Sequence, residues 1–200
     1  MPTQISPPAS DEYAPFYADY VQRASRRENL YAAYSDQIAE LHTALGSLSD
    51  AQACFRPGPQ EWSIKEVMGH INDVERIFSY RMLRISRGDA TSLPGFEQED
   101  YVRAAGFDLY SLGDLVGEFE FLRRANRIAI QHMTEEAVDC RGTASGYTVS
   151  ARALIYMIVG HVDHHMASLQ EKYLPIALTL SEVSLAHWLL ETTHPKIGGL

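Results

Sequence analysis

The segment GHVDHH at residues 160–165 carries three of the eight histidines of the chain and is the strongest sign of chemistry in the sequence. If this segment is helical, His161 and His165 lie one turn apart on the same face, because an α-helix turns by about 100° per residue. His164 lies one turn from His161 on the other side of that face. Two neutral imidazoles at such a spacing can bind one divalent cation, as in helical H-x-x-x-H zinc sites. The spacing leaves open whether His164 or His165 is the partner of His161.

The residues that follow His161 argue against one familiar class of zinc enzyme. Metalloproteases of the H-E-x-x-H type need a glutamate directly after the first histidine, where it acts as the general base. Val162 and Asp163 stand after His161 instead. A peptidase of this class is therefore not expected.

A third ligand has to come from another helix, and His70 is the best candidate. It lies among Val67, Ile71 and Val74, an apolar series at helical spacing, so it should face inward. An isolated histidine on such a stripe is more often an ordinary core residue. Several buried imidazoles without partners would be unfavourable, however, and a shared metal ion removes that penalty. Spacing alone leaves a metal site and a purely structural core about equally open.

Hydrophobic spacing predicts four long amphipathic helices that would position these histidines. The helix that carries His70 has the clearest start, because Ser63 can cap its first N–H groups and Glu66 completes a capping box. No internal repeat or convincing strand is found, and residues 139–147 are expected to form a turn-rich loop. The predicted fold is all-α, a four-helix bundle with a long crossover connection at about 89–110 and short extra helices at the termini. The long helices are expected at residues 15–48, with a break near 25–28, at 63–87, at 111–133 and at 150–173, where Pro175 ends the last one.

The chain divides into three predicted parts. Residues 1–13 are rich in Pro, Ser and Thr and should form a flexible N-terminal tail. Residues 14–175 hold the bundle, and residues 176–200 form a C-terminal extension with a short helix at about 181–191. A chain of 200 residues, of which 46% are hydrophobic, is large and apolar enough for one domain of this kind.

Composition narrows the expected partners and compartment. The formal net charge of −9 repels phosphate backbones, so nucleic-acid binding is not expected, and the basic cluster of Arg123, Arg124 and Arg127 is interpreted as a solvated face. Cys54 and Cys140 are interpreted as free thiols in a reducing compartment. The N-terminus lacks the regions of a signal peptide, and no apolar run approaches the roughly 18 residues of a membrane span. We therefore expect a cytoplasmic protein that does not contact membranes.

Two segments of the sequence resemble the DinB-like superfamily, also called the DinB/YfiT-like metalloenzymes. The first is residues 62–102, which begins WSIKEVMGHINDVE, and the second is residues 150–174, SARALIYMIVGHVDHHMASLQEKYL. The resemblance covers roughly residues 32–174, and the two motifs in this order are fairly specific. It implies a four-helix bundle with a long crossover, which suits the long predicted connection.

The resemblance also implies a metal site. The usual triad of the family is one histidine on the second helix and an H-x-x-x-H pair on the last helix of the bundle. Carried over to this sequence, the triad is His70, His161 and His165, and His164 becomes a neighbour that could orient a ligand. The implied ion is a divalent transition metal, with zinc or nickel as the common candidates, although three histidines also accept iron or manganese.

Relatives with known activity include thiol-dependent S-transferases and a mycothiol-dependent maleylpyruvate isomerase, so the resemblance implies chemistry on a small-molecule substrate. A three-histidine site leaves positions for a low-molecular-weight thiol or a water, and either becomes a better nucleophile on the ion. A thiol-dependent S-transferase or a hydrolase is the leading interpretation. The alternatives are a non-catalytic metal-binding stress-response bundle and a structural helical dimer whose histidines belong to the core. The flat helical faces of such bundles would also suit a homodimer, although the sequence itself does not show one.

Three further side chains are candidates for supporting roles. Arg81 lies on the same helix face as His70 and could anchor a substrate carboxylate, or form an ion pair with Glu118 or Glu120. Asp73 and Asp163 could accept hydrogen bonds from histidines and orient them, or could be ordinary solvated helix residues.

Overall fold

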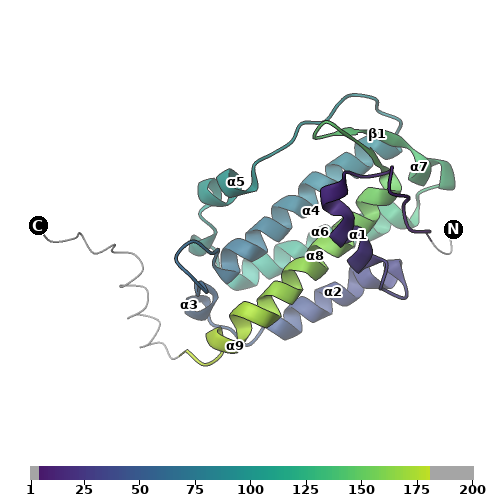
Figure 1. Ribbon diagram of the computed structural model, residues 1–200. Helices are drawn as coiled ribbons and strands as arrows, with labels where there is room; N and C mark the ends of the chain where they lie inside the picture. Colours follow the sequence, from purple (N-terminus) through teal and green to yellow (C-terminus); the bar gives the residue numbers. More distant parts are fainter. Residues whose placement is uncertain (1–4, 181–200) are drawn as a thin grey trace, which may run out of the picture.

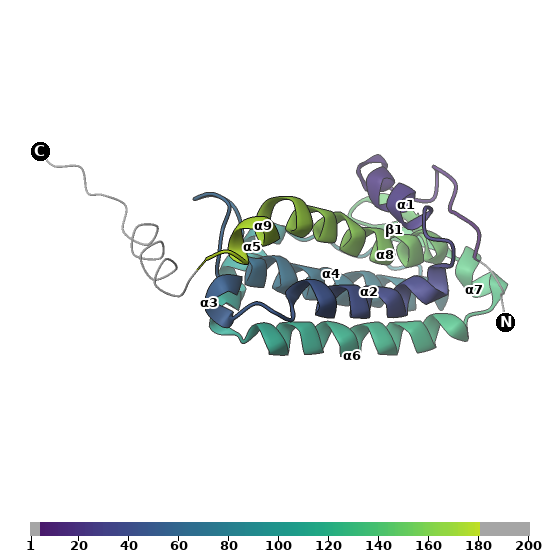
Figure 2. The same ribbon diagram turned by 90° about the horizontal axis from the view of Figure 1, so that it is seen from below.

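The computed structural model describes residues 5–180, so the short helix predicted at 181–191 lies outside the described residues. Its four long helices are α2 (Leu30–Leu45), α4 (Ile64–Ser86), α6 (Leu112–Gln131) and α8 (Ala151–Ser168). They lie side by side in Figure 1 and Figure 2, and both α2 and α4 pack against α6 and α8. The predicted four-helix bundle is thereby confirmed. Among residues 5–180, none of the helices combines the length and the apolar character that crossing a membrane requires.

Polar side chains fix where the long helices begin. Ser63 accepts a hydrogen bond from the backbone N–H of Glu66, and the Glu66 carboxylate accepts one from the N–H of Ser63, which confirms the predicted capping box. Asn29, Ser111 and Ser150 cap α2, α6 and α8 through their side-chain oxygens. Each such cap contributes about 1 kcal/mol, because it satisfies a backbone donor that has no partner inside the helix.

Helices α4 and α6 begin at the same end of the bundle. The carboxylate of Asp50 accepts a hydrogen bond from the backbone N–H of Leu112, at the start of α6, at 2.6 Å. The same carboxylate pairs with Lys65 Nζ, in the first turn of α4, at 3.1 Å. The connection at 87–111 therefore has to return along the length of the bundle, as Figure 1 shows, and the long crossover is confirmed. It carries α5 (Gln98–Ala105) and the 3-10 turn η2 (Phe107–Leu109).

A β-hairpin follows α6 and the short helix α7 (Glu135–Asp139), where we predicted only a loop. Strands β1 (Arg141–Ala144) and β2 (Tyr147–Ser150) pair antiparallel, with Thr143 opposite Thr148. The two-residue turn places Ser145 and Gly146 at positive φ, the geometry that suits the twist of a hairpin. The backbone of Leu93 bonds to Thr143 and Ser145, so the hairpin also holds the crossover connection. The prediction that the chain forms no strand is wrong, because strands of four residues are too short to show a clear alternation.

The N-terminal residues pack on the bundle instead of extending freely. The first predicted helix is broken as expected, into the 3-10 turn η1 (Pro15–Tyr17), α1 (Ala18–Ala24) and α2. Before η1, the hydroxyl of Tyr156 donates to the carbonyl of Ile5 at 2.7 Å, and the N–H of Ser150 donates to the carbonyl of Glu12 at 3.0 Å. Ile5 and Glu12 are both buried. The expectation of a flexible tail is therefore corrected for residues 5–13.

Two other segments differ from the prediction. The connection at 49–61, between two of the predicted long helices, contains the short helix α3 (Asp50–Ala53), which Ser49 caps. At the end of the last bundle helix, α8 passes through the π-helical turn η3 (Leu169–Tyr173) into α9 (Leu174–Ala177). Pro175 thus sits in the first turn of α9, where the missing N–H of proline is tolerated, and it does not end the helix as predicted.

The apolar core forms two clusters along the bundle, and the predicted ligands lie where the clusters meet. Helix α4 contributes Val74 and Phe78 to one cluster and Val67 and Ile71 to the other. His70 lies on α4 next to Ile71, close to the boundary between these two sets. Imidazole rings therefore interrupt the apolar core where the two clusters meet.

Candidate metal centre

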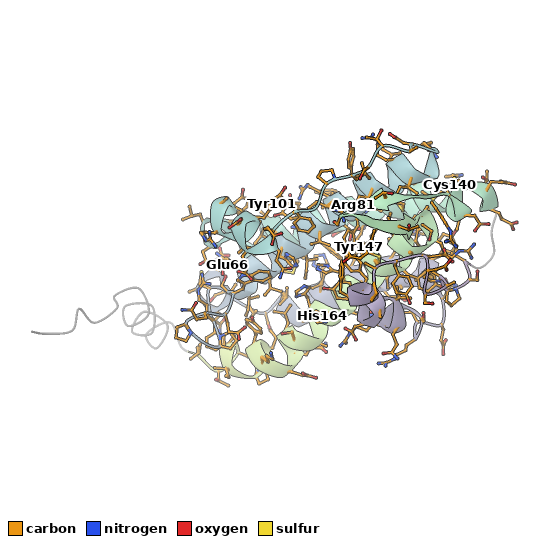
Figure 3. The ribbon with its side chains drawn as sticks, turned by 45° about the horizontal axis from the view of Figure 1, so that its top comes forward. Glu66, Arg81, Tyr101, Cys140, Tyr147 and His164 are labelled. Carbon is orange, nitrogen blue, oxygen red and sulfur yellow. The ribbon has the colours of Figure 1, made fainter. Side chains whose placement is uncertain are left out.

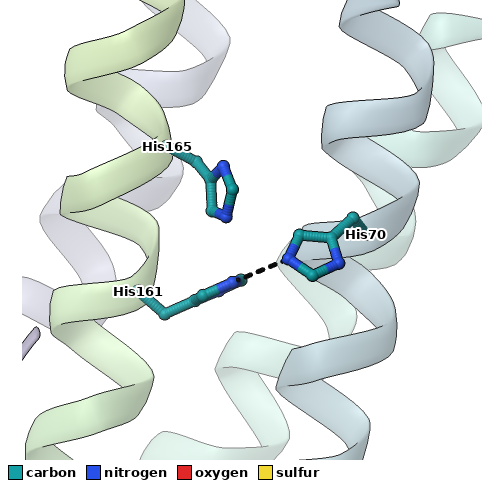
Figure 4. Close-up of side chains that lie close together, drawn as sticks. All are labelled: His70, His161 and His165. Atoms are coloured by element: carbon teal, nitrogen blue, oxygen red, sulfur yellow. Dashed lines mark hydrogen bonds between the residues drawn. The ribbon is translucent and has the colours of Figure 1, made fainter. Parts of the chain in front are cut away.

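Three histidines converge inside the bundle, as Figure 4 shows. His161 and His165 project from α8 toward His70 on α4, and one ligand nitrogen of each lies within 4.8 Å of the other two. The Nε2 atoms of His161 and His70 lie 3.1 Å apart, so one ring nitrogen donates a hydrogen bond to the other. His70 and His161 are each 3% exposed, and His165 is partly buried. The predicted convergence of imidazoles from two helices is what the structure has.

The donor types, and the spacing of His70 and His161, suit a single divalent transition ion. Zinc binds histidine nitrogens at about 2.0–2.1 Å, so two nitrogens on a tetrahedral ion lie about 3.3 Å apart. The 3.1 Å separation of the His70 and His161 nitrogens is close to this spacing. The group consists of imidazoles alone, a donor set that suits zinc, nickel and related ions but not calcium or magnesium.

Burial keeps the three imidazoles neutral at physiological pH. It lowers the pKa of His70 to about 4, and the neighbouring His164 adds a smaller repulsion. Burial likewise holds the pKa of His161 and of His165 well below the ordinary value, helped by the other histidines of the cluster. A neutral ring offers a lone pair, so protons compete little with a metal ion for these nitrogens.

The metal-free protein is expected to lose stability as the pH falls from 7 to 5. The folded chain holds the pKa of His70 near 4, whereas an unfolded histidine titrates near 6.5, so the unfolded state binds more protons in this window. The contribution of His70 to the free energy of unfolding is fully present above about pH 6.5 and is lost as the pH falls toward 4. Between pH 7 and pH 5, His70 alone should lower the free energy of unfolding by about 2 kcal/mol. Urea unfolding of chelator-treated protein at both pH values measures this loss. A His70→Gln variant should lose less stability between pH 7 and pH 5. Equal losses in the two proteins would contradict the low pKa of His70.

A cavity of about 550 Å³ opens beside the cluster, and His70 and His161 form part of its wall. The rest of the wall comes from η1 and α1, from α4, from the crossover connection and from the hairpin turn. Its volume lies in the range of small-molecule sites, about 300–1,000 Å³. The donor atoms are therefore next to a space that a small molecule can enter.

Residues 33–169 match the family model of the DinB superfamily. This chain belongs to the DinB superfamily. The fold is also similar to that of YfiT from Bacillus subtilis, described as a probable metal-dependent hydrolase with an unusual four-helix bundle topology. The likeness has a TM-score of 0.64 and 13% sequence identity, and it covers 80% of this chain and 91% of YfiT. At this identity it shows the shared fold. No curated protein matches the chain.

His164 lies outside the histidine cluster of this DinB protein. Its Nδ1 is 3.2 Å from Asp19 Oδ2, and its ring stacks edge-on against Tyr20 at 5.3 Å. The side chain is 42% exposed, and Figure 3 shows it at the side of α8 that α1 covers. The choice between His164 and His165, which spacing left open, therefore falls on His165 as the neighbour of His70 and His161.

Arg81 braces the crossover connection of the DinB bundle. Its guanidinium donates to the carbonyl of Pro94 at 2.7 Å and to Ser145 Oγ at 3.1 Å, and the side chain is buried. The predicted ion pair with Glu118 or Glu120 is wrong, because those carboxylates pair with other arginines. Arg81 also lines a smaller cavity of about 310 Å³, so its role as an anchor for a substrate carboxylate stays a prediction.

Within residues 5–180, neither aspartate proposed to orient the ligands forms a hydrogen bond with a histidine. Asp163 accepts hydrogen bonds from Arg27 Nε at 3.1 Å and from Gln37 Nε2 at 2.7 Å. The carboxyl group of Asp73 forms no hydrogen bond in this part of the chain, and burial raises its pKa. The imidazole rings instead pack against aromatic rings. The ring centroid of Trp62 lies 4.7 Å from that of His70, and the ring centroid of Phe78 lies 6.2 Å from that of His161.

Sequence reasoning missed the side chains that hold α8 in place behind the site. Tyr34, Gln37 and Arg123 each donate a hydrogen bond to a backbone carbonyl of α8, at 2.8–3.0 Å. Arg123 is fully buried, so its assignment to a solvated face is wrong. The only signal in the sequence was that polar residues stood at positions of the apolar stripes. These contacts fix the helix that carries two of the three histidines.

Proposed function

We propose that this DinB-superfamily protein is a divalent-metal-dependent hydrolase that acts on a small molecule, with the ion held by His70, His161 and His165. The observation that carries the proposal is a cluster of three neutral imidazoles, two of which, His70 and His161, lie in the wall of a cavity of ligand size. When bound there, a divalent transition ion supplies Lewis acidity and lowers the pKa of a nucleophile at its open position. Zinc and nickel are the proposed ions, because they suit an all-histidine donor set.

The protein contributes the rigid frame of such a site. His161 and His165 are fixed one turn apart by α8, whose backbone is bound by side chains from α2 and α6. His70 is fixed by α4 and by the ring of Trp62. Side chains held in this way can keep a ligand geometry without reorganisation when a substrate binds, which favours catalysis.

The open cavity favours an enzyme over a non-catalytic metal-binding bundle. A storage or structural site would use all the available donors and close around the ion. Here His164 points to Asp19 rather than to the cluster, and the cavity reaches the ligands His70 and His161. Both features support a position for substrate on the ion.

A thiol-dependent S-transferase is the second candidate, because a second cavity adjoins the one beside the histidines. A smaller cavity of about 310 Å³ shares the wall residues Gly95 and Phe96 with the larger one. Neither Cys54 nor Cys140 lines either cavity, so a thiol would have to enter from solution as a low-molecular-weight compound. Either reaction would use the same three histidines.

Elemental analysis and thermal melting test the metal site. We expect about one equivalent of a divalent transition metal per chain after purification. Its removal by a chelator should lower the melting temperature by about 10 °C, since a ligand present at 1,000 times its Kd stabilises by about 4 kcal/mol. Protein without metal and with an unchanged melting temperature would overturn the proposal.

Activity separates the two reactions. Metal-loaded protein should hydrolyse members of a panel of small esters and amides, and the metal-stripped protein should not. Consumption of a low-molecular-weight thiol together with an electrophile, without hydrolysis, would instead favour the transferase.

A further inference from the structure

The cavity beside the histidines has a wall of aromatic rings that comes from the N-terminal segment. Phe16, Tyr17 and Tyr20, on η1 and α1, line it from one side. Phe78 on α4 and Phe96 on the crossover connection line it from the other sides. A small molecule in this cavity thus meets aromatic rings on several sides, together with polar side chains of the crossover connection and the hairpin turn.

The aromatic wall is built against the ligands themselves. The ring of Tyr20 lies 5.3 Å from that of His161 at an interplanar angle of 79°. Tyr17 packs edge-on against Phe78 at 5.7 Å, which joins η1 to α4 across the cavity. Phe16 is 59% exposed, so it forms the outer rim. An occupant beside the histidines is therefore in reach of these rings.

A glycine allows α1 to lie this close to the site. A methyl group added at Gly160, the residue before His161, would lie 1.8 Å from the backbone oxygen of Tyr20. Helix α1 lies on the outer side of α8 in Figure 1 and Figure 2. Any side chain at position 160 would push α1 away from α8. The contact of Asp19 with His164 adds a polar link between the two helices. The wall is therefore a fixed part of the molecule.

The wall also lies outside the part of the chain that defines the family. The match to the DinB superfamily covers residues 33–169, whereas η1 and α1 end at Ala24. The histidines belong to the matched region, and Phe16, Tyr17 and Tyr20 do not. One side of the cavity thus comes from outside the matched region that supplies the histidines.

We propose that the substrate carries an aromatic ring, and that Phe16, Tyr17 and Tyr20 form the surface that selects it. The ring packs among the aromatic side chains, and the reacting group of the substrate faces the histidines. The position of the reacting group rests on the proposed function. Aromatic rings favour edge-to-face and offset contacts with one another beyond what their buried area provides. A saturated ring of the same size can enter the cavity but does not make these contacts.

Binding of neutral probes to the full chain tests the inference. Benzamide and cyclohexanecarboxamide share a polar group and differ in the ring, and Kd for each can be measured by NMR titration with and without added zinc. We expect benzamide to bind about fivefold more tightly than cyclohexanecarboxamide in both states. Equal affinities, or no binding of benzamide, would overturn the inference.

Variants locate the binding surface. Phe16→Leu should weaken benzamide binding about threefold, and Phe16→Leu combined with Tyr20→Leu about tenfold. Phe121→Leu, at a position on α6 that is 76% exposed and lines neither cavity, is the matched control and should bind as the original chain does. Since Phe16 is exposed, its variant should fold normally, and unchanged benzamide binding to it would contradict the proposed wall. Because metal-free protein is included, a failure to bind zinc overturns only the proposed function and leaves this result interpretable.

Discussion

His165→Ala is expected to weaken divalent-metal binding by about a hundredfold or more, whereas His164→Ala should leave it nearly unchanged. The two histidines are adjacent in sequence, yet only His165 lies with His70 and His161 in the cluster of donor nitrogens. Loss of a ligand should exceed the ten- to hundredfold effect that is typical of losing a group that merely supports a ligand. His164 instead contacts Asp19 on α1, on the outer side of α8.

Competition with a chromophoric chelator measures the affinity of both variants for zinc and nickel. Thermal melting in the presence of a chelator provides the folding control, because both metal-free variants should melt as cooperatively as the original protein. Equal weakening by the two substitutions would mean that α8 presents its histidines differently from the structure. Retention of full affinity by His165→Ala would remove it from the site.

Much of the candidate site could be predicted because its determinants are local. The distance between His161 and His165 is fixed by the helix period, and the capping box of Ser63 and Glu66 fixes the start of the helix that carries His70. The choice of His165 over His164 could not be made from spacing. It depends on how α8 is rotated relative to α4, and that rotation is set by packing across the whole bundle.

The errors concern contacts between residues far apart in the sequence. The hairpin escaped prediction because its strands have four residues each, and its link to Leu93 joins segments about fifty residues apart. Arg81 was expected to pair with a helix but binds the carbonyl of Pro94 in a loop. Arg123 was expected in water as part of a basic cluster, and its buried partner, Glu75, could not be assigned from the sequence.

The ion pair of Glu75 and Arg123 leads to the second large effect, since Glu75→Ala is expected to destabilise the protein by about 3–5 kcal/mol. Both side chains are at most 1% exposed, and Arg123 Nε lies 3.0 Å from Glu75 Oε2, without the alignment of a hydrogen bond. Burial raises the pKa of Glu75, while Arg123 and a hydrogen bond from Asn126 oppose that rise. Removing the carboxylate leaves a buried guanidinium whose remaining partners are the carbonyl of Ile158 and the rings of Tyr34 and Phe119.

Glu120→Ala is the matched control for this substitution. Glu120 also pairs with an arginine, Arg124, but that arginine is 67% exposed, so losing the carboxylate leaves its charge in water and should change stability far less than the loss of Glu75 does. Urea unfolding at neutral pH measures both variants. A third protein, in which Glu75→Leu is combined with Arg123→Met, removes both charges and should recover most of the loss, because a buried pair exchanged for apolar side chains is often close to neutral. If the double variant regains stability but binds zinc more weakly than the original protein, the ion pair also helps to position the histidines of α8. Its arginine binds the carbonyl of Ile158, one helical turn before His161, and an apolar replacement cannot make that bond.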